Sequence, residues 1–107
     1  MIYKFKSKSA GDVVMLGPNG DQMLRLLGRE PAPQGIIEAA HMPSAIQALE
    51  RAVADDEAAR ERAQSEAAAK GEPPPVREGV SLRQRVWPVV EMMKRSQAHG
   101  HDIVWGV

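Results

Sequence analysis

The chain has 107 residues, which suffices for one domain with a single core. Its 14 basic and 14 acidic residues cancel, which argues against a nucleic-acid-binding or membrane-surface protein, since both usually carry a basic excess. Because there is no cysteine, disulfides and cysteine-ligated zinc sites are excluded. No uncharged run approaches the roughly 18 residues that span a bilayer. Lysines interrupt the start of the chain where a signal peptide needs an apolar core, so we expect a cytoplasmic protein.

The start of the chain predicts a β-hairpin. Residues 1–7 alternate, with Tyr3 and Phe5 on one side and the lysines on the other, as in a half-buried strand. A short loop leads to a second apolar strand over residues 12–16, and strands joined so closely pair antiparallel. Because this second strand is apolar on both faces, we expect it to lie inside the sheet.

A short helix over residues 21–27 should follow. Asp21 or Asn19 can cap its start, and Gly28 can close it in the left-handed conformation. About two turns are too few for an isolated helix, so it must pack on the sheet. Residues 35–38 then predict a third short strand, because they include two adjacent β-branched residues.

A long helix should begin near Pro43, a residue suited to the first helical position. Three large apolar residues at helical spacing give it a core face: Ile46, Leu49 and Val53. Over residues 54–70 the only apolar residue is alanine, which favours a solvated extension over a partner-binding helix. With the proline-rich linker that follows, residues 54–79 form an excursion from a single domain spanning residues 1–107.

The end of the chain predicts a capped helix and a final strand. Ser81 and Gln84 form a capping box, and Gly100 is a stop signal. One apolar stripe lies between them: Leu82, Val86, Val89, Val90 and Met93. Pro88 falls inside this helix, where it removes a hydrogen bond and predicts a kink or a tightened first turn. Residues 102–105 form the last strand.

These elements predict an α+β fold in the order β-β-α-β-α-α-β. The amphipathic helices should cover one face of a small, mainly antiparallel sheet, because each has a single apolar stripe to bury.

Three residues near the end of the chain form a candidate metal site. His99, His101 and Asp102 supply two imidazoles and a carboxylate within four residues. Gly100 separates the two rings across a helix-to-strand reversal, unlike the i,i+4 spacing of a helical zinc motif, and a polar helix C-cap is the other interpretation. We assign no cofactor and no catalytic residue, since no serine lies in a G-x-S-x-G motif. The alternative function is a metal- or small-ligand-dependent enzyme that uses these three residues.

Trp87, Pro88 and Trp105 form a candidate binding surface. Core packing is the default interpretation for both tryptophans. Trp105 lies two residues from the end of the chain, on a strand that could lie at the edge of the sheet. An exposed tryptophan on an edge strand would serve dimerisation or partner binding. The leading interpretation is a non-enzymatic binding or regulatory module that contacts an unknown protein partner or a second copy of itself.

Several stretches together resemble the bacterial Domain of Unknown Function 1840 family. They are I-Y-K-F-K-S over 2–7, G-D-V-V-M-L over 11–16, G-I-I over 35–37, M-P over 42–43, S-L-R-Q-R over 81–85, W-P over 87–88 and V-W-G over 104–106. The resemblance is weakest over residues 54–79. It implies a short α+β domain of the proteobacterial cytosol, with no established activity, no catalytic residues to transfer, and Pro88 as a built-in feature of its helix.

Overall fold

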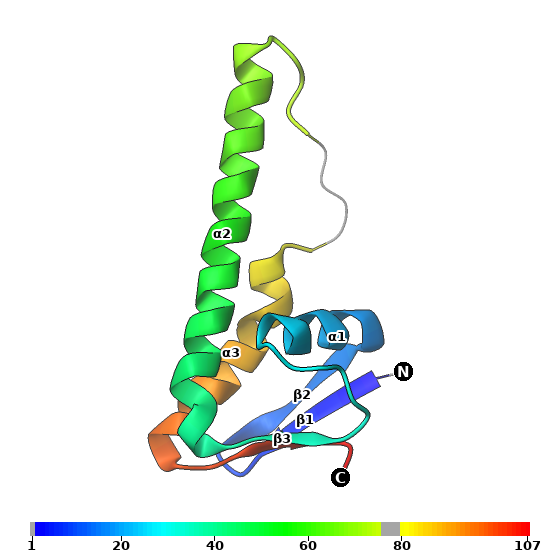
Figure 1. Cartoon of the computed structure of the whole chain (residues 1–107), viewed down its shortest axis with the longest axis vertical. Helices are drawn as coiled ribbons and strands as arrows, with labels where there is room; N and C mark the ends of the chain where they lie inside the picture. The colour runs from blue at the N-terminus through cyan, green and yellow to red at the C-terminus, as the bar shows by residue number, and fades with distance from the viewer. Residues whose placement is uncertain (1, 76–79) are drawn as a thin grey trace.

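The computed structural model describes residues 2–75 and 80–107 (Figure 1). In chain order its elements are β1 (Ile2–Ser7), β2 (Ala10–Leu16), α1 (Gly17–Leu26), β3 (Gly35–Ile37), the short 3-10 helix η1 (Ala39–His41), α2 (Met42–Ala69), α3 (Leu82–His99) and β4 (Ile103–Trp105). The strands form one antiparallel sheet, so the α+β class and the order β-β-α-β-α-α-β are confirmed.

The strand order is β2-β1-β4-β3, and it corrects two expectations. β2 lies at an edge of the sheet and not inside it, and its side chains Val14 and Leu16 are apolar yet exposed. β4, which the sequence also allows at an edge, lies between β1 and β3 and pairs with both. A strand with apolar side chains on both faces is therefore not always buried on both faces. The place of a strand in the sheet also depends on how strands far apart in sequence pair, here β1 with β4.

The core lies between one face of the sheet and the helices, which all lie on the same side of it (Figure 1). Phe5 is fully buried at its centre. Its ring stacks on Tyr3, with centroids 5.7 Å apart, and meets the Trp105 ring edge-on at 5.5 Å. Such aromatic pairs add to the stabilisation that burial alone provides.

Trp105 is a core residue with only 3% of its surface exposed. Its indole Nε1–H donates to the carbonyl of Ala32 at 2.9 Å, which satisfies the polar end of the side chain. Gly35 is paired with Trp105 across the β3–β4 ladder, and the indole ring covers it. Core packing, the default interpretation, is therefore confirmed for Trp105, and the alternative of an exposed tryptophan on an edge strand is wrong.

The first helix starts differently from the prediction. α1 begins at Gly17, with Pro18 in its first turn, and no side chain caps its N-terminus. Proline suits that position because its missing N–H would have had no helical partner. Asp21 accepts a hydrogen bond from the Tyr3 hydroxyl instead, and this bond, with burial, raises the pKa of Tyr3. The closing residue was predicted correctly, since Gly28 has φ +80°.

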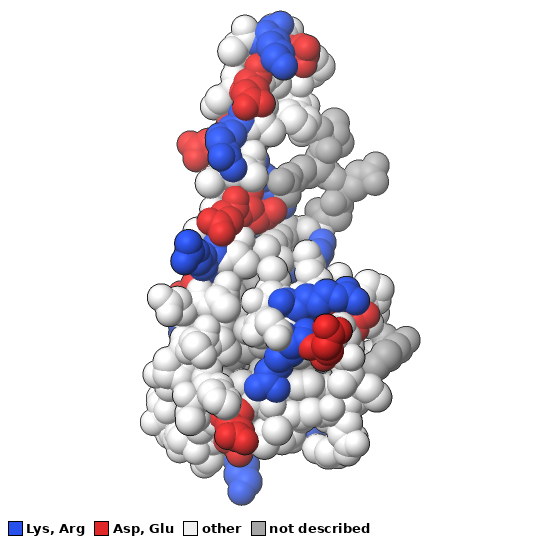
Figure 2. Space-filling view, in the orientation of Figure 1, with Lys and Arg blue, Asp and Glu red and all other residues white. Residues whose placement is uncertain are grey.

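α2 runs for 28 residues from Met42 to Ala69 and has two different parts. Its first part buries large apolar side chains in the core: Met42, Ile46, Leu49 and Val53. Beyond Val53, basic and acidic side chains alternate along the projecting helix (Figure 2). Asp56 and Arg60 form an i,i+4 ion pair at 3.3 Å. The proline-rich segment predicted to follow is described only to residue 75, and residues 76–79 lie outside the described part.

α3 carries the predicted capping box and stop signal. The Ser81 hydroxyl accepts from the Gln84 amide at 3.1 Å, and the Gln84 side chain accepts from the Ser81 amide at 3.1 Å. Gly100 adopts φ +68° and ends the helix. Pro88 is exposed, and the helix continues through it as one element.

Replacing Gly35 with alanine should destabilise the protein. A Cβ at this position would overlap the Trp105 ring, which is buried and cannot move aside. We expect Gly35→Ala to lower the free energy of unfolding by about 1–3 kcal/mol in urea denaturation. Gly11→Ala is the matched control, because nothing lies within 4 Å of its Cβ position in the other edge strand. Equal stability of the two variants would contradict the packing of Trp105 on Gly35.

Candidate functional site: the open face of the sheet

The sheet has a second face that none of the helices in the described part of the chain covers (Figure 1). Because side chains alternate along a strand, the neighbours of the buried residues point away from the helices. We call this surface the open face; the register places on it Ile2, Lys4, Lys6, Val14, Leu16, Ile36 and Val104. Its large apolar side chains are strongly exposed: 63% for Ile2, 59% for Val14, 63% for Leu16 and 41% for Ile36.

The open face is organised in rows that cross the strands. Lys6 of β1 lies opposite Val104 of β4, which lies opposite Ile36 of β3. In the other direction Lys4 lies opposite Val14 and Ile2 opposite Leu16. Directly opposed residues are the closest neighbours on a sheet, so lysine stems and apolar side chains share one surface.

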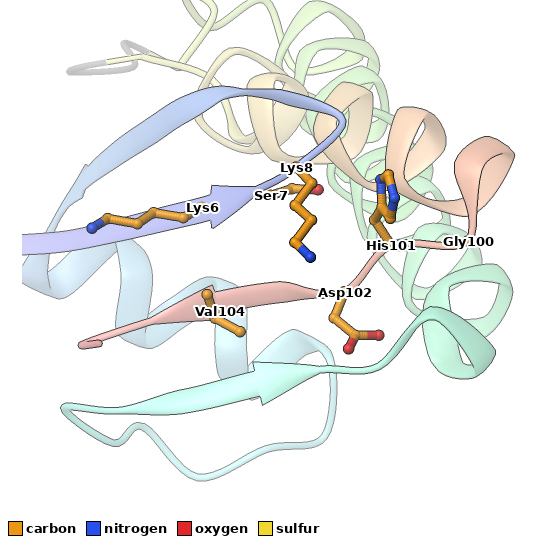
Figure 3. Close-up of a pocket in the computed structure, with 7 residues that line it drawn as sticks. All are labelled: Lys6, Ser7, Lys8, Gly100, His101, Asp102 and Val104. Atoms are coloured by element: carbon orange, nitrogen blue, oxygen red, sulfur yellow. The ribbon is translucent and has the colours of Figure 1, made fainter.

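A hollow of about 540 Å³ lies at one end of the open face. It forms where the β1–β2 turn approaches the connection between α3 and β4, and it is lined by Lys6, Ser7, Lys8, Gly100, His101, Asp102 and Val104 (Figure 3). Figure 3 shows Lys8 extending from the turn toward β4, which carries Val104 and is preceded by Asp102. The hollow therefore combines an ammonium, a carboxylate, an imidazole and an apolar side chain.

Side-chain hydrogen bonds hold the two sides of the hollow together. The Ser7 and Ser96 hydroxyls are 2.8 Å apart, and Ser96, fully buried, donates to the carbonyl of Met92 at 2.8 Å. Ser7 is therefore the donor in that pair. On the other side of the turn, the Ser9 hydroxyl bonds to Nδ1 of His101. These hydrogen bonds connect the turn to the C-terminal end of α3 and the residues just after it. They therefore fix the two sides of the hollow relative to each other.

The β1 side of the hollow carries an excess of positive charge. Lys4 pairs with Asp12 at 3.6 Å, but within the described residues neither Lys6 nor Lys8 has an aspartate or glutamate partner. Lys6 Nζ instead donates to the carbonyl of Val107 at 3.4 Å. On the opposite side, Asp102 Oδ1 accepts from the backbone amide of Ala39 at 2.7 Å. An acidic group that reaches this side would meet Lys8, which has no aspartate or glutamate partner in the described part of the chain, and Lys6, which is bonded only to a backbone oxygen.

The candidate metal-binding residues are only partly brought together. His101 and Asp102 line the hollow, whereas His99 does not, and the two imidazole centroids are 6.3 Å apart. Asp102 and His101 are already hydrogen-bonded to Ala39 and Ser9. Within residues 2–75 and 80–107, no three histidine, aspartate or glutamate side chains are placed to hold a metal ion.

The candidate binding residues Trp87, Pro88 and Trp105 do not share an exposed surface, because Trp105 is buried. Trp87 packs partly against the core, with Arg83 and Lys94 at 5.3 and 5.2 Å from its ring. These cations also pair with α2: Arg83 with Glu57 at 2.8 Å, and Lys94 with Glu50 at 3.4 Å. The hydrogen bonds from Arg83 lower the pKa of Glu57. Arg83 and Lys94 therefore join α3 to α2, and both also contact the Trp87 ring.

Sequence reasoning missed Val14, Leu16, Ile36, Val104 and Lys8 as site residues. One signal was available, since the alternation in residues 1–7 already placed Ile2 and two lysines opposite the buried aromatic residues. The helices expected from the sequence were sufficient for one face only. The remaining open-face residues could not be identified without the strand order.

Removing the Asp102 carboxylate should weaken the fold near the hollow. Asp102→Ala leaves the Ala39 amide without its acceptor, and we expect a loss of about 1 kcal/mol in the free energy of unfolding, as for a lost helix cap. Asp102→Asn keeps a side-chain oxygen that can accept from the Ala39 amide, so its free energy of unfolding should fall less. Thermal or urea denaturation measures both. An Asp102→Ala variant as stable as the native chain would contradict a structural role for Asp102 at the hollow.

The comparisons with known proteins identify a family but no characterised relative. Among the described helices, none combines the length and apolarity needed to cross a bilayer. No curated protein and no solved structure is significantly similar to the chain. One family profile matches residues 1–105, which is nearly the whole chain, and confirms the resemblance seen in its short stretches. The chain belongs to the family described as Domain of unknown function (DUF1840).

Proposed function

We propose that this chain is a small, non-enzymatic cytoplasmic module that binds another protein through the open face of its sheet. The observation that carries the proposal is the exposure of four large apolar side chains on that face: Ile2, Val14, Leu16 and Ile36. Fully burying one such side chain contributes about 1.5–3 kcal/mol. Scattered exposed apolar residues are common, but a group on one uncovered sheet face is typical of an interaction surface.

The charges of the hollow indicate what the partner carries. Lys6 and Lys8 have no aspartate or glutamate partner within the described residues, and Val104 and Ile36 lie beside Lys6 on the same row. A partner segment that carries apolar side chains flanked by carboxylates would bury its apolar side chains on the open face. Its carboxylates would pair with Lys6 and Lys8. Such pairing contributes mainly to specificity and to the rate of association.

The sheet face is a better binding surface than the tryptophan region. The Trp87 ring already has two cations over it, and Trp105 is 3% exposed. The alternative function, an enzyme using His99, His101 and Asp102, has less support, because two of these groups already have hydrogen-bond partners in the fold.

A charge placed at Ile36 should weaken partner binding. The purified chain serves as bait in a native cell extract, and retained proteins are then purified and tested for direct binding. We expect Ile36→Glu to weaken that binding at least about tenfold, as at an interface hot spot, because it introduces a carboxylate into the apolar row. Val80→Glu is the control, since Val80 is 52% exposed but precedes α3, away from the sheet.

Circular dichroism verifies that both variants are folded. Equal binding by the two variants, or a native chain that retains no protein, would contradict the proposal. A fluorescent probe with an apolar body and a sulfonate, anilinonaphthalene sulfonate, gives an independent readout. Its fluorescence should rise with the native chain and with Val80→Glu, and rise less with Ile36→Glu.

A further inference from the structure

The two edges of the sheet differ in how they are protected. β3 is only three residues long, and the guanidinium of Arg29 donates to the carbonyl of Ile36 at 2.8 Å. β2 is seven residues long. Within the described residues, no side chain forms a hydrogen bond with the backbone of β2. Its outer backbone groups are therefore left to solvent or to another strand.

β2 has few of the devices by which edge strands avoid pairing with other chains. Such devices include lysine, proline, bulges that twist the edge away and very short strands. The register with β1 shifts between Phe5 and Ser7, so β2 is irregular near the turn, whereas residues 13–16 pair with β1 in regular register. Between Ala10 and Leu16 there is neither lysine nor proline. The only charged residue, Asp12, is engaged by Lys4 of the neighbouring strand. Gly11 has nothing within 4 Å of its Cβ position, so the side of this edge near the turn is unobstructed.

We propose that β2 pairs antiparallel with β2 of a second copy of this chain, so that one sheet continues across both chains. An antiparallel pair of identical strands is related by a two-fold axis, the symmetry that most dimers use. With the axis at Val13 or Val14, Asp12 lies opposite Val14 or Leu16 of the other copy, and no like charges face each other. The chain has no net charge, so the copies do not repel one another at long range.

The pairing would also unite apolar surface from both copies. Val14 and Leu16 project from β2 onto the open face, and Ile2 lies opposite Leu16 on β1. In the dimer these side chains and their counterparts become neighbours. A strand of seven residues is about 24 Å long at roughly 3.4 Å per residue. A contact along a single strand belongs with the small, transient interfaces, so we expect a weak dimer whose population depends on concentration.

Sedimentation equilibrium of the full chain tests the pairing. From micromolar to millimolar concentration, the average mass should rise from the 11.7 kDa of one chain toward twice that value. Gly11→Lys adds a charge to the edge without a clash, and this variant should remain a monomer throughout. Ala59→Lys is the matched control with the same charge change at an exposed position of α2, and it should associate like the native chain.

Hydrogen exchange locates the contact. Amides of residues 10–16 should become more protected as concentration rises in the native chain, and not in Gly11→Lys. A native chain that stays monomeric at millimolar concentration overturns the proposal. So does a Gly11→Lys variant, folded by circular dichroism, that associates as the native chain does, or protection that appears elsewhere. Because Ile36 lies on the opposite edge strand, partner binding can fail while self-pairing holds, and the reverse.

Discussion

The alternation of side chains along β1 is the constraint on which the rest of the structure depends. β1 pairs with β2 on one side and with β4 on the other. Because directly paired residues lie on the same face of the sheet, the residues of β1 that face the helices determine which residues of β2 and β4 do so. Phe5 lies fully buried on one face, between Tyr3 and Trp105. The helices all lie over that face. The same alternation that builds the core therefore also creates an uncovered face.

Much of the fold follows from local signals. The hairpin, the capping box at Ser81, and the closures at Gly28 and Gly100 depend on residues close together in sequence, and they were predicted correctly. The start of α1 was not, because proline in the first turn began the helix without a side-chain cap. Short-range rules work where the physical interaction is itself short-range.

The arrangement of the strands and the site could not be predicted in the same way. Nothing local distinguishes an apolar strand inside the sheet from one at its edge, and β2 proved to be an edge strand. The bonds from Ser9 to His101 and from Ala39 to Asp102 join residues 92 and 63 positions apart. His101 and Asp102 were noticed as possible metal ligands, but the structure gives each a hydrogen-bond partner that holds one side of the hollow in place. Trp105, noticed for its position near the end of the chain, anchors the core.

The central claim is that the purified chain leaves one face of its sheet uncovered. A soluble paramagnetic relaxation agent, observed through methyl NMR signals, tests it directly. We expect strong relaxation of the methyl groups of Val14, Leu16 and Ile36, and little for Val89, Val90 and Ile103, which are fully buried. Equal protection of the two sets would mean that the open face is covered in solution and would contradict the claim.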